Sequence, residues 1–244
     1  MGFGTSPLVT GSLLIVQAGG PMHNLMAFDK VGGKLRWAAN HSTTSGYSSP
    51  VVAHLAGRRQ VIVCANDRLF AVDPESGSLL WGVAIESARE STRPPAILSG
   101  NRILLQLPEE ARLYEILDEG GRLGARLVWR SPRLRASYSP TLFHDGYLFG
   151  FNDQFVVCVD PADGGIRWRA RTGWGSAILV DGKLLILGTR SGKLRIARAS
   201  PHVYDELLTT TVFDDGVHAP TTPAFTEGRI LLRKLTEIVA LEVR

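Results

Sequence analysis

Short apolar runs alternate with polar turns along the whole chain, and this pattern predicts β-strands. Six of these runs each follow a turn that contains Gly: LLIVQ, QVIVCA, RILLQL, YLFGF, KLLILG and RILLR. Apolar runs of this length bounded by turn residues are typical of β-hairpins. Other segments alternate between apolar and charged residues, which indicates strands with one face in water. No segment shows the apolar spacing of an amphipathic helix, so we expect an all-β chain.

The runs belong to a repeat, and successive repeats open 37 to 46 residues apart. The openings are Ser6-Pro7, Ser49-Pro50, Pro94-Pro95, Ser139-Pro140, Ser176-Ala177 and Thr222-Pro223. A four-strand pattern follows the openings, and the fourth strand carries Trp in LMAFDKVGGKLRW, LFAVDPESGSLLW and FVVCVDPADGGIRW. Repeats of four strands at this period predict a β-propeller in which each repeat forms one blade.

The predicted domain organisation is a single partial propeller over residues 1–244 with six repeats. Their approximate ranges are 5–47, 48–92, 93–137, 138–174, 175–218 and 219–244. The sixth repeat stops at EIVALEVR after three strands, so it lacks a fourth. In the third repeat we expect a longer connection from Pro108 to Gly124, and in the fifth Phe213 stands where other repeats have Trp.

Two sets of residues are expected to shape the blades. The turn between the third and fourth strands begins with Asp, which accepts backbone hydrogen bonds, and ends near Gly, which tolerates positive φ. These residues are Asp29, Asp73 and Asp160, with Gly33, Gly77 and Gly165. The fourth strands carry large rings that we expect to dock between neighbouring blades, namely Trp37, Trp81, Trp129 and Trp168.

The Ser-Pro openings, the D-x-x-x-G turns and the fourth-strand Trp resemble the tryptophan-docking repeats of the PQQ-like, quinoprotein-type β-propellers, among them the BamB-type scaffold lipoproteins. The resemblance spans nearly the whole chain. Because such propellers usually close eight blades, it implies an open arc of blades three to eight, without the signal peptide and two N-terminal blades of the same protein. The alternative is a closed six-bladed ring in which Gly2-Phe3-Gly4 completes the last blade. The resemblance also implies a periplasmic or secreted location for the complete protein, and the chain as written begins without a signal peptide.

The sequence lacks the catalytic signature that this resemblance would require of an enzyme. A quinoprotein dehydrogenase is expected to carry vicinal cysteines, calcium ligands and an Asp base. Cys64 and Cys158 are far apart, however, and Glu86, Glu90 and Glu206 form no ligand pattern. We therefore expect no catalytic residue and no bound PQQ, calcium or other metal. The six histidines have no metal-ligand spacing, and the sequence has no phosphate-binding, HExxH or GxSxG motif.

Composition narrows the range of partners. A hydrophobic share of 44% with 20% charged residues suits a globular fold. The net charge of +4 comes from 27 basic and 23 acidic residues spread along the sequence, so there is no basic stripe for nucleic acid. No apolar run in the sequence reaches the length of about 18 residues that a membrane span needs.

One set of side chains is a candidate binding face at the propeller axis. A large or charged residue stands shortly before each innermost strand, and the set comprises Phe3, Tyr47, Arg93, Tyr138, Trp174 and His218. Aromatic and Arg side chains are frequent in binding hot spots, so we expect a protein partner or a small ligand there. The alternative is a plug that only packs in the channel mouth. A non-catalytic binding scaffold is therefore the first hypothesis. A PQQ-dependent dehydrogenase, or a fragment of one, and a carbohydrate- or peptide-processing propeller are the alternatives.

Overall fold

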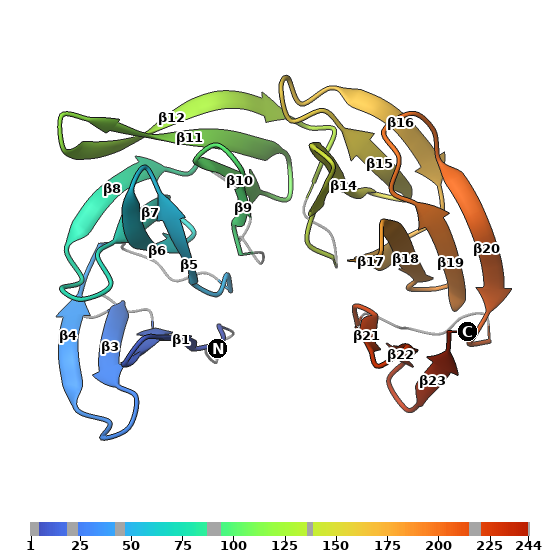
Figure 1. Ribbon diagram of the computed structural model, residues 1–244, viewed down its shortest axis with the longest axis horizontal. Coiled ribbons are helices and arrows are strands. Elements are labelled where there is room, and N and C mark those ends of the chain that lie inside the picture. Colours follow the sequence, from blue (N-terminus) through green and yellow to red (C-terminus); the bar gives the residue numbers. More distant parts are fainter. Residues whose placement is uncertain are drawn as a thin grey trace. The chain divides into compact units, whose positions relative to one another are not determined.

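The apolar runs form strands in the computed structural model, which describes residues 5–18, 24–41, 47–86, 94–135, 139–214 and 221–243. These ranges contain 23 strands and no helix, arranged in six antiparallel sheets (Figure 1). The first five sheets have four strands each, and the sixth has three. The predicted series of four-stranded units with a shorter sixth unit is thus confirmed. The segment Gly2-Phe3-Gly4, on which the closed-ring alternative depends, lies outside the described residues. Nothing in the described ranges could cross a membrane as a helix.

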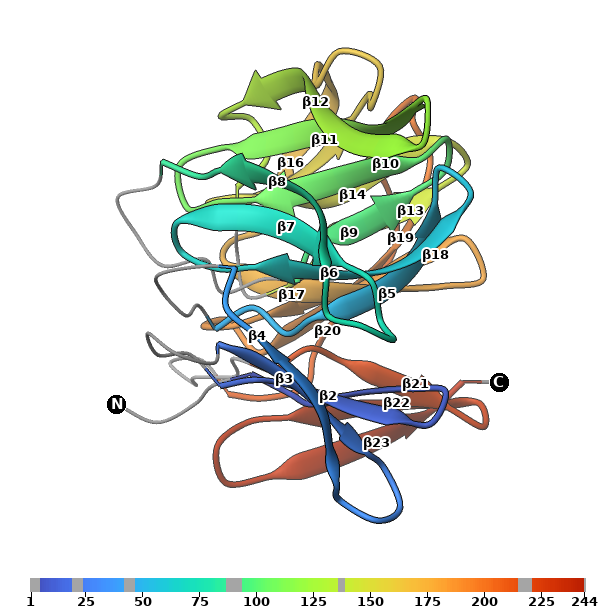
Figure 2. The same cartoon turned by 90° about the vertical axis from the view of Figure 1, so that its left-hand side faces the viewer.

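The chain divides into two compact units, Met1–Arg130 and Ser131–Arg244, and each is described by itself. In the first unit the strands of each sheet are neighbours in chain order (Figure 2). The first sheet contains β1 (Leu8–Thr10), β2 (Leu13–Gln17), β3 (Leu25–Asp29) and β4 (Leu35–Ala39). The second contains β5 (Val51–Leu55), β6 (Arg58–Cys64), β7 (Arg68–Val72) and β8 (Leu79–Ala84). The third contains β9 (Ala96–Leu98), β10 (Arg102–Gln106), β11 (Ala111–Glu119) and β12 (Arg122–Ser131).

The second unit repeats this order of neighbours. The fourth sheet contains β13 (Leu142–His144), β14 (Tyr147–Asn152), β15 (Phe155–Val159) and β16 (Ile166–Arg171). The fifth contains β17 (Gly175–Val180), β18 (Lys183–Gly188), β19 (Lys193–Arg198) and β20 (Asp205–Thr211). The sixth contains β21 (Ala224–Thr226), β22 (Arg229–Arg233) and β23 (Ile238–Glu242).

The turn between the third and fourth strands is built on its first residue. The Asp29 carboxylate accepts the backbone N–H of Gly32 at 2.7 Å and of Val31 at 3.1 Å, and these hydrogen bonds, that of Gly32 most, lower the pKa of Asp29. The N–H of Gly33 bonds to the Asp29 carbonyl, and Gly33 has a φ of 68°. The turn that begins at Asp73 uses the same two hydrogen bonds, and in the turn that begins at Asp160 the carboxylate accepts the N–H of Ala162 at 2.9 Å.

One predicted turn residue is wrong by one position. In the turn that starts at Asp160, the positive φ of 70° falls on Gly164, while Gly165 is the residue after it. The reason is geometric, because the left-handed residue stands four positions after the Asp and donates its N–H to the Asp carbonyl, as Gly33 does to Asp29. The spacing from the Asp therefore decides which of the two consecutive glycines takes the left-handed conformation.

The expected long connection in the third repeat is also wrong, because residues 111–119 and 122–131 form the two longest strands of the described chain, β11 and β12. A tight turn through Gly120 and Gly121, both with positive φ, joins them. The acidic residues between the apolar ones hide the strand pattern in the sequence. Leu113 and Ile116 are nonetheless buried in β11.

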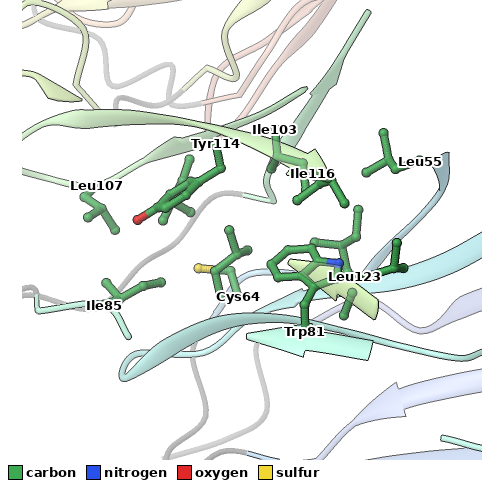
Figure 3. Packing of buried hydrophobic residues seen from close by; sticks show 13 residues of the cluster. Leu55, Cys64, Trp81, Ile85, Ile103, Leu107, Tyr114, Ile116 and Leu123 are labelled. Carbon is green, nitrogen blue, oxygen red and sulfur yellow. The ribbon is translucent and has the colours of Figure 1, made fainter. Parts of the chain in front are cut away.

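The hydrophobic core lies between successive sheets within each unit. Between the second and third sheets, the Trp81 ring lies beside Leu123, and Cys64, Ile85 and Tyr114 belong to the same cluster (Figure 3). A similar cluster separates the first sheet from the second, and two more join the fourth, fifth and sixth sheets. Packing of one sheet face on the next is the main source of stability that the fold provides.

The fourth-strand tryptophans differ in how they are held. The Trp37 side chain is buried, and its indole N–H donates to the Pro74 carbonyl of the second sheet's turn at 2.8 Å. The Trp168 N–H donates to the Ser200 carbonyl at 2.7 Å. Trp81 is also buried, but its N–H donates to Gln60 Oε1 of its own sheet at 2.6 Å. Trp129 is half-buried. Phe213, which replaces Trp in the fifth repeat, is buried in the cluster between the fifth and sixth sheets.

Candidate binding site at the loop end of the sheets

Each sheet has two ends. At the turn end, hairpins join the first strand to the second and the third to the fourth. At the loop end, the second strand passes to the third and the chain enters from the preceding sheet. Two residues of the predicted axial set, Tyr47 and Trp174, lie at this loop end, one in each unit. The other four, Phe3, Arg93, Tyr138 and His218, lie outside the described residues, so the convergence of the six stays a prediction.

In the first unit, hydrogen bonds join the starts of two neighbouring sheets around Tyr47. The side chain of Tyr47 is exposed, and two residues later Ser49 Oγ accepts the backbone N–H of Ser6 at 2.8 Å. The hydroxyl of Thr5 donates to the Gln17 carbonyl at 3.0 Å. Pro7 and Pro50 follow these serines and stand directly before the innermost strands β1 and β5, where a residue with no N–H and a fixed φ is tolerated. The Ser-Pro opening thus links one sheet to the next.

Two buried polar atoms lie within this linked region without a partner. Gln17 is only 3% exposed and Ser48 is fully buried, yet neither Gln17 Oε1 nor Ser48 Oγ has a hydrogen bond. Each such atom costs about 1–3 kcal/mol of stability. Because Thr5 bonds to Gln17 and its neighbour Ser6 bonds to Ser49, both unpaired atoms belong to the same few residues as the exposed ring of Tyr47. The exposed ring of Tyr47 and two buried, unpaired oxygen atoms thus belong to the same loop-end segments.

The second unit shows the same construction around Trp174. This half-buried side chain stands two residues before Ser176, whose hydroxyl donates to the Thr221 carbonyl of the sixth sheet at 3.0 Å. The Trp174 carbonyl accepts the N–H of Thr189 at 2.8 Å. Thr189 is buried and its Oγ1 has no hydrogen bond. In the fourth sheet, Ser139 Oγ bonds to both backbone groups of the fifth sheet's Ala177, at 2.9 and 3.0 Å.

Tyr47 and Trp174 are predicted from the sequence. The buried polar residues of the loop end, Gln17, Ser48 and Thr189, are not. A signal was present for Gln17, because a polar residue that ends an apolar run such as LLIVQ sits at the loop end of the second strand. Nothing in the sequence marks Ser48 or Thr189 as buried.

The turn end of the second sheet carries a separate hollow of about 260 Å³. Its lining includes two basic residues, Arg58 and Arg59, and two acidic ones, Asp73 and Glu75. The arginines are already engaged, because Arg58 donates to the Gly121 carbonyl at 2.9 Å and Arg59 to the hydroxyl of Thr10. The arginines that line this hollow therefore bind the second sheet to its neighbours in the first unit.

A metal or quinone site would require clustered ligating side chains, suitably placed cysteines and free carboxylates. Over the described ranges, no three His, Cys, Asp or Glu side chains lie together in a way that could hold a metal ion. Cys64 and Cys158 are buried on β6 and β15 of different sheets, and burial raises the pKa of the Cys158 thiol to about 12. The carboxylates of Asp29, Asp73 and Asp160 accept hydrogen bonds from their own turns.

Sheets of four antiparallel strands in chain order, joined at their first strands by Ser-Pro openings, define a PQQ-like β-propeller repeat protein. The family model for outer membrane protein assembly factor BamB matches residues 2–169, and the chain belongs to this family. No curated protein matches the sequence.

Solved structures share the fold at low sequence identity. BamB from Moraxella catarrhalis superposes with a TM-score of 0.68 and 13% identity, over 98% of this chain and 72% of that chain. A europium-containing methanol dehydrogenase gives a TM-score of 0.66 and 11% identity, over 93% of this chain and 60% of that one. The quinohemoprotein alcohol dehydrogenase from Comamonas testosteroni gives 0.62 and 13%, over 99% of this chain and 52% of that one. At such identities these likenesses show the fold alone.

Proposed function

We propose that this chain is a non-catalytic binding scaffold that recognises a protein partner or a small ligand at the loop end of its blades. The observation that carries this proposal is the exposed ring of Tyr47 at the loop end, where the neighbouring sheet starts are joined by hydrogen bonds and Gln17 Oε1 and Ser48 Oγ are buried without partners. Membership of the BamB family supports a scaffold role and a location outside the cytoplasm, where the complete protein would be periplasmic or secreted. Binding at the axis by the full set of six predicted residues is part of the same proposal.

Site-specific photo-crosslinking tests the site. A photoreactive phenylalanine analogue is placed at Tyr47. The matched control carries it at Leu35, which is 49% exposed on β4 of the same unit. We expect a discrete crosslinked product in cell extract from position 47 only, and competition by unlabelled wild-type chain. A product of equal yield from position 35, or none from position 47, would contradict the proposed site.

The alternative function, a PQQ-dependent dehydrogenase or a fragment of one, is favoured by the similarity to the two dehydrogenase structures. Against it, the described residues present no set of three metal-ligating side chains. A ligand that binds the folded state at one hundred times its Kd stabilises that state by about 2.7 kcal/mol. We expect no shift in the thermal unfolding midpoint when PQQ and calcium are added. A shift that grows with cofactor concentration would show that the cofactor binds and would contradict the scaffold proposal in favour of the alternative.

A further inference from the structure

The turn between β3 and β4 carries the most exposed large apolar side chain of the described residues. Val31 is 89% exposed and stands in the middle of the turn, at the tip of the hairpin (Figure 1). A hydrogen bond from the Asp29 N–H to the Lys34 carbonyl closes this turn at 2.8 Å. The same position holds Glu75 in the second sheet and Ala162 in the fourth, so the turn itself does not require an apolar residue of this size.

A second exposed apolar side chain, Leu35, lies at the base of the same turn. Leu35 is 49% exposed, and its cross-strand neighbour Phe28 is half-buried. In the second sheet, Leu79 occupies the equivalent place beside Val72 and stays 42% exposed, although Val72 is buried between the first and second sheets. The exposure of Leu35 therefore does not depend on whether a further sheet packs on this face.

Three basic residues surround these two apolar ones. Lys30 and Lys34 flank Val31, Arg36 follows Leu35, and all three are exposed. The ion pairs among the described residues involve none of the three. We call the five residues Lys30, Val31, Lys34, Leu35 and Arg36 the hairpin tip.

The charge near the hairpin tip is predominantly positive. From residue 1 to residue 41 the chain contains three basic residues, those of the hairpin tip, and a single acidic residue, Asp29. The Asp29 carboxylate accepts two N–H groups of its own turn. Lys30 Nζ donates to the Gly11 carbonyl at 2.8 Å, which leaves its charge without a counter-ion. Exposed apolar groups within a basic surface are typical of sites that bind anionic interfaces.

We propose that the hairpin tip docks on the surface of a bilayer that contains anionic phospholipids. Val31 and Leu35 enter the boundary between the headgroups and the acyl chains, while the long basic side chains keep their charges at the level of the phosphates. Each Lys or Arg close to an anionic bilayer strengthens binding by about fivefold. The hairpin tip belongs to the turn end of the first sheet and Tyr47 to the loop end, so this inference does not depend on the proposed function.

A bilayer fits the hairpin tip better than an acidic protein surface does. Protein interfaces have an apolar centre and a polar rim, and both lie in one contact surface. In the hairpin tip, Val31 stands at the end of the turn, whereas Lys34 and Arg36 come closer to the strand. A protein partner would therefore need a pocket for Val31 before its carboxylates could reach the basic groups. A layer of lipid headgroups admits an apolar tip without such a pocket.

Vesicle binding tests the lipid composition that the proposal requires. The full chain is sedimented with vesicles of phosphatidylcholine and phosphatidylglycerol in equal amounts, and with vesicles of phosphatidylcholine alone. We expect binding to the anionic vesicles to be at least about tenfold tighter, and to weaken as the salt concentration rises. Equal binding to the two kinds of vesicle, or no binding to either, would overturn the proposal.

Two pairs of variants test the residues. Arg36→Gln should weaken binding to anionic vesicles by about fivefold, whereas Arg130→Gln, at an exposed arginine at the loop end of β12, should change it by less than about twofold. Val31→Ser should weaken binding by about fivefold, and Val128→Ser, at a valine that is 39% exposed on β12, should leave it unchanged. Thermal unfolding checks that all four variants fold. Equal losses within either pair would contradict the assigned role of the hairpin tip.

A fluorescent label distinguishes insertion from adsorption at another surface. Cys64 and Cys158 are buried, so a polarity-sensitive dye should react with the new thiol of Val31→Cys or of the control Val128→Cys. We expect a blue shift of the dye at position 31 when anionic vesicles are added, and none at position 128. A dye at position 31 that stays in water while the chain binds would refute the docking geometry. Binding of soluble polyglutamate as tightly as of anionic vesicles would assign the hairpin tip to an acidic protein instead.

Discussion

The substitution Gly77→Ala tests how Trp37 of the first sheet packs on the turn of the second sheet. This residue has a φ of 72°, and a Cβ added there would lie 2.5 Å from Cε3 of Trp37. The Trp37 N–H bonds to Pro74 in the same turn, so the ring cannot move without losing that hydrogen bond. Gly77→Ala therefore combines a left-handed backbone penalty of about 1–2 kcal/mol with an overpacking cost of about 1–3 kcal/mol. We expect a total loss of about 2–5 kcal/mol in the free energy of unfolding.

Gly33 provides a matched control in the preceding sheet. It occupies the same turn position with a φ of 68°, but nothing lies within 4 Å of its added Cβ. Gly33→Ala should therefore cost only the backbone penalty of about 1–2 kcal/mol. Urea unfolding followed by far-UV circular dichroism gives both values. In the background Trp37→Ala, where the ring is absent, the cost of Gly77→Ala should fall to that of Gly33→Ala. If the two glycine variants lose the same stability in the wild-type background, Trp37 does not dock as described.

Two further predictions concern buried groups. Because burial raises the pKa of Cys158 to about 12, above its ordinary value near 9.0, the folded thiol stays neutral, so it should resist iodoacetamide at pH 9 and react only on unfolding. The stability that the neutral thiol contributes is complete below the pKa of the unfolded chain and is lost as pH rises toward the folded pKa of about 12. In Cys158→Ala, the free energy of unfolding measured in urea should therefore fall less steeply with pH in this range. An equally steep fall in the variant would contradict the prediction. Trp81→Phe leaves Gln60 Oε1 buried without its indole donor and should cost about 1–3 kcal/mol by urea unfolding, whereas an unchanged midpoint would show that this hydrogen bond contributes nothing.

The sequence predicts the strands and their grouping because one local pattern decides both. Each apolar run between turns must bury its side chains, and a turn residue with a specific backbone requirement follows at a fixed distance. Where that pattern is interrupted, prediction is wrong. In β11 the acidic residues Glu115, Asp118 and Glu119 hide an alternation that the structure still uses. At Asp160 two glycines compete for one left-handed position, and only the count of residues from the Asp decides between them.

The candidate site is less predictable, because it depends on hydrogen bonds between residues far apart in the sequence. Ser6 and Ser49 are both recognisable as strand openings, but their mutual hydrogen bond exists only once the two sheets are neighbours. The burial of Ser48 and Thr189 likewise comes from packing between sheets and has no local signature.

Polar side chains at the turn end have hydrogen-bond partners, whereas several buried ones at the loop end have none. This difference favours the loop end as the binding site. At the turn end, Asp29, Asp73 and Asp160 satisfy the backbone N–H groups of their own turns. At the loop end, Gln17 Oε1, Ser48 Oγ and Thr189 Oγ1 are buried without hydrogen bonds, although small apolar residues would fill the same space at lower cost. Arg195 Nη1 on β19 is also buried without a hydrogen bond, so such atoms are not confined to the loop end, but three of them lie on the loop-end segments that carry Tyr47 and Trp174 or bond to them. Because these atoms are buried, a partner would recover that energy only if binding opens the loop end and brings hydrogen-bonding groups to them, whereas the carboxylates of the turn end already have their hydrogen bonds.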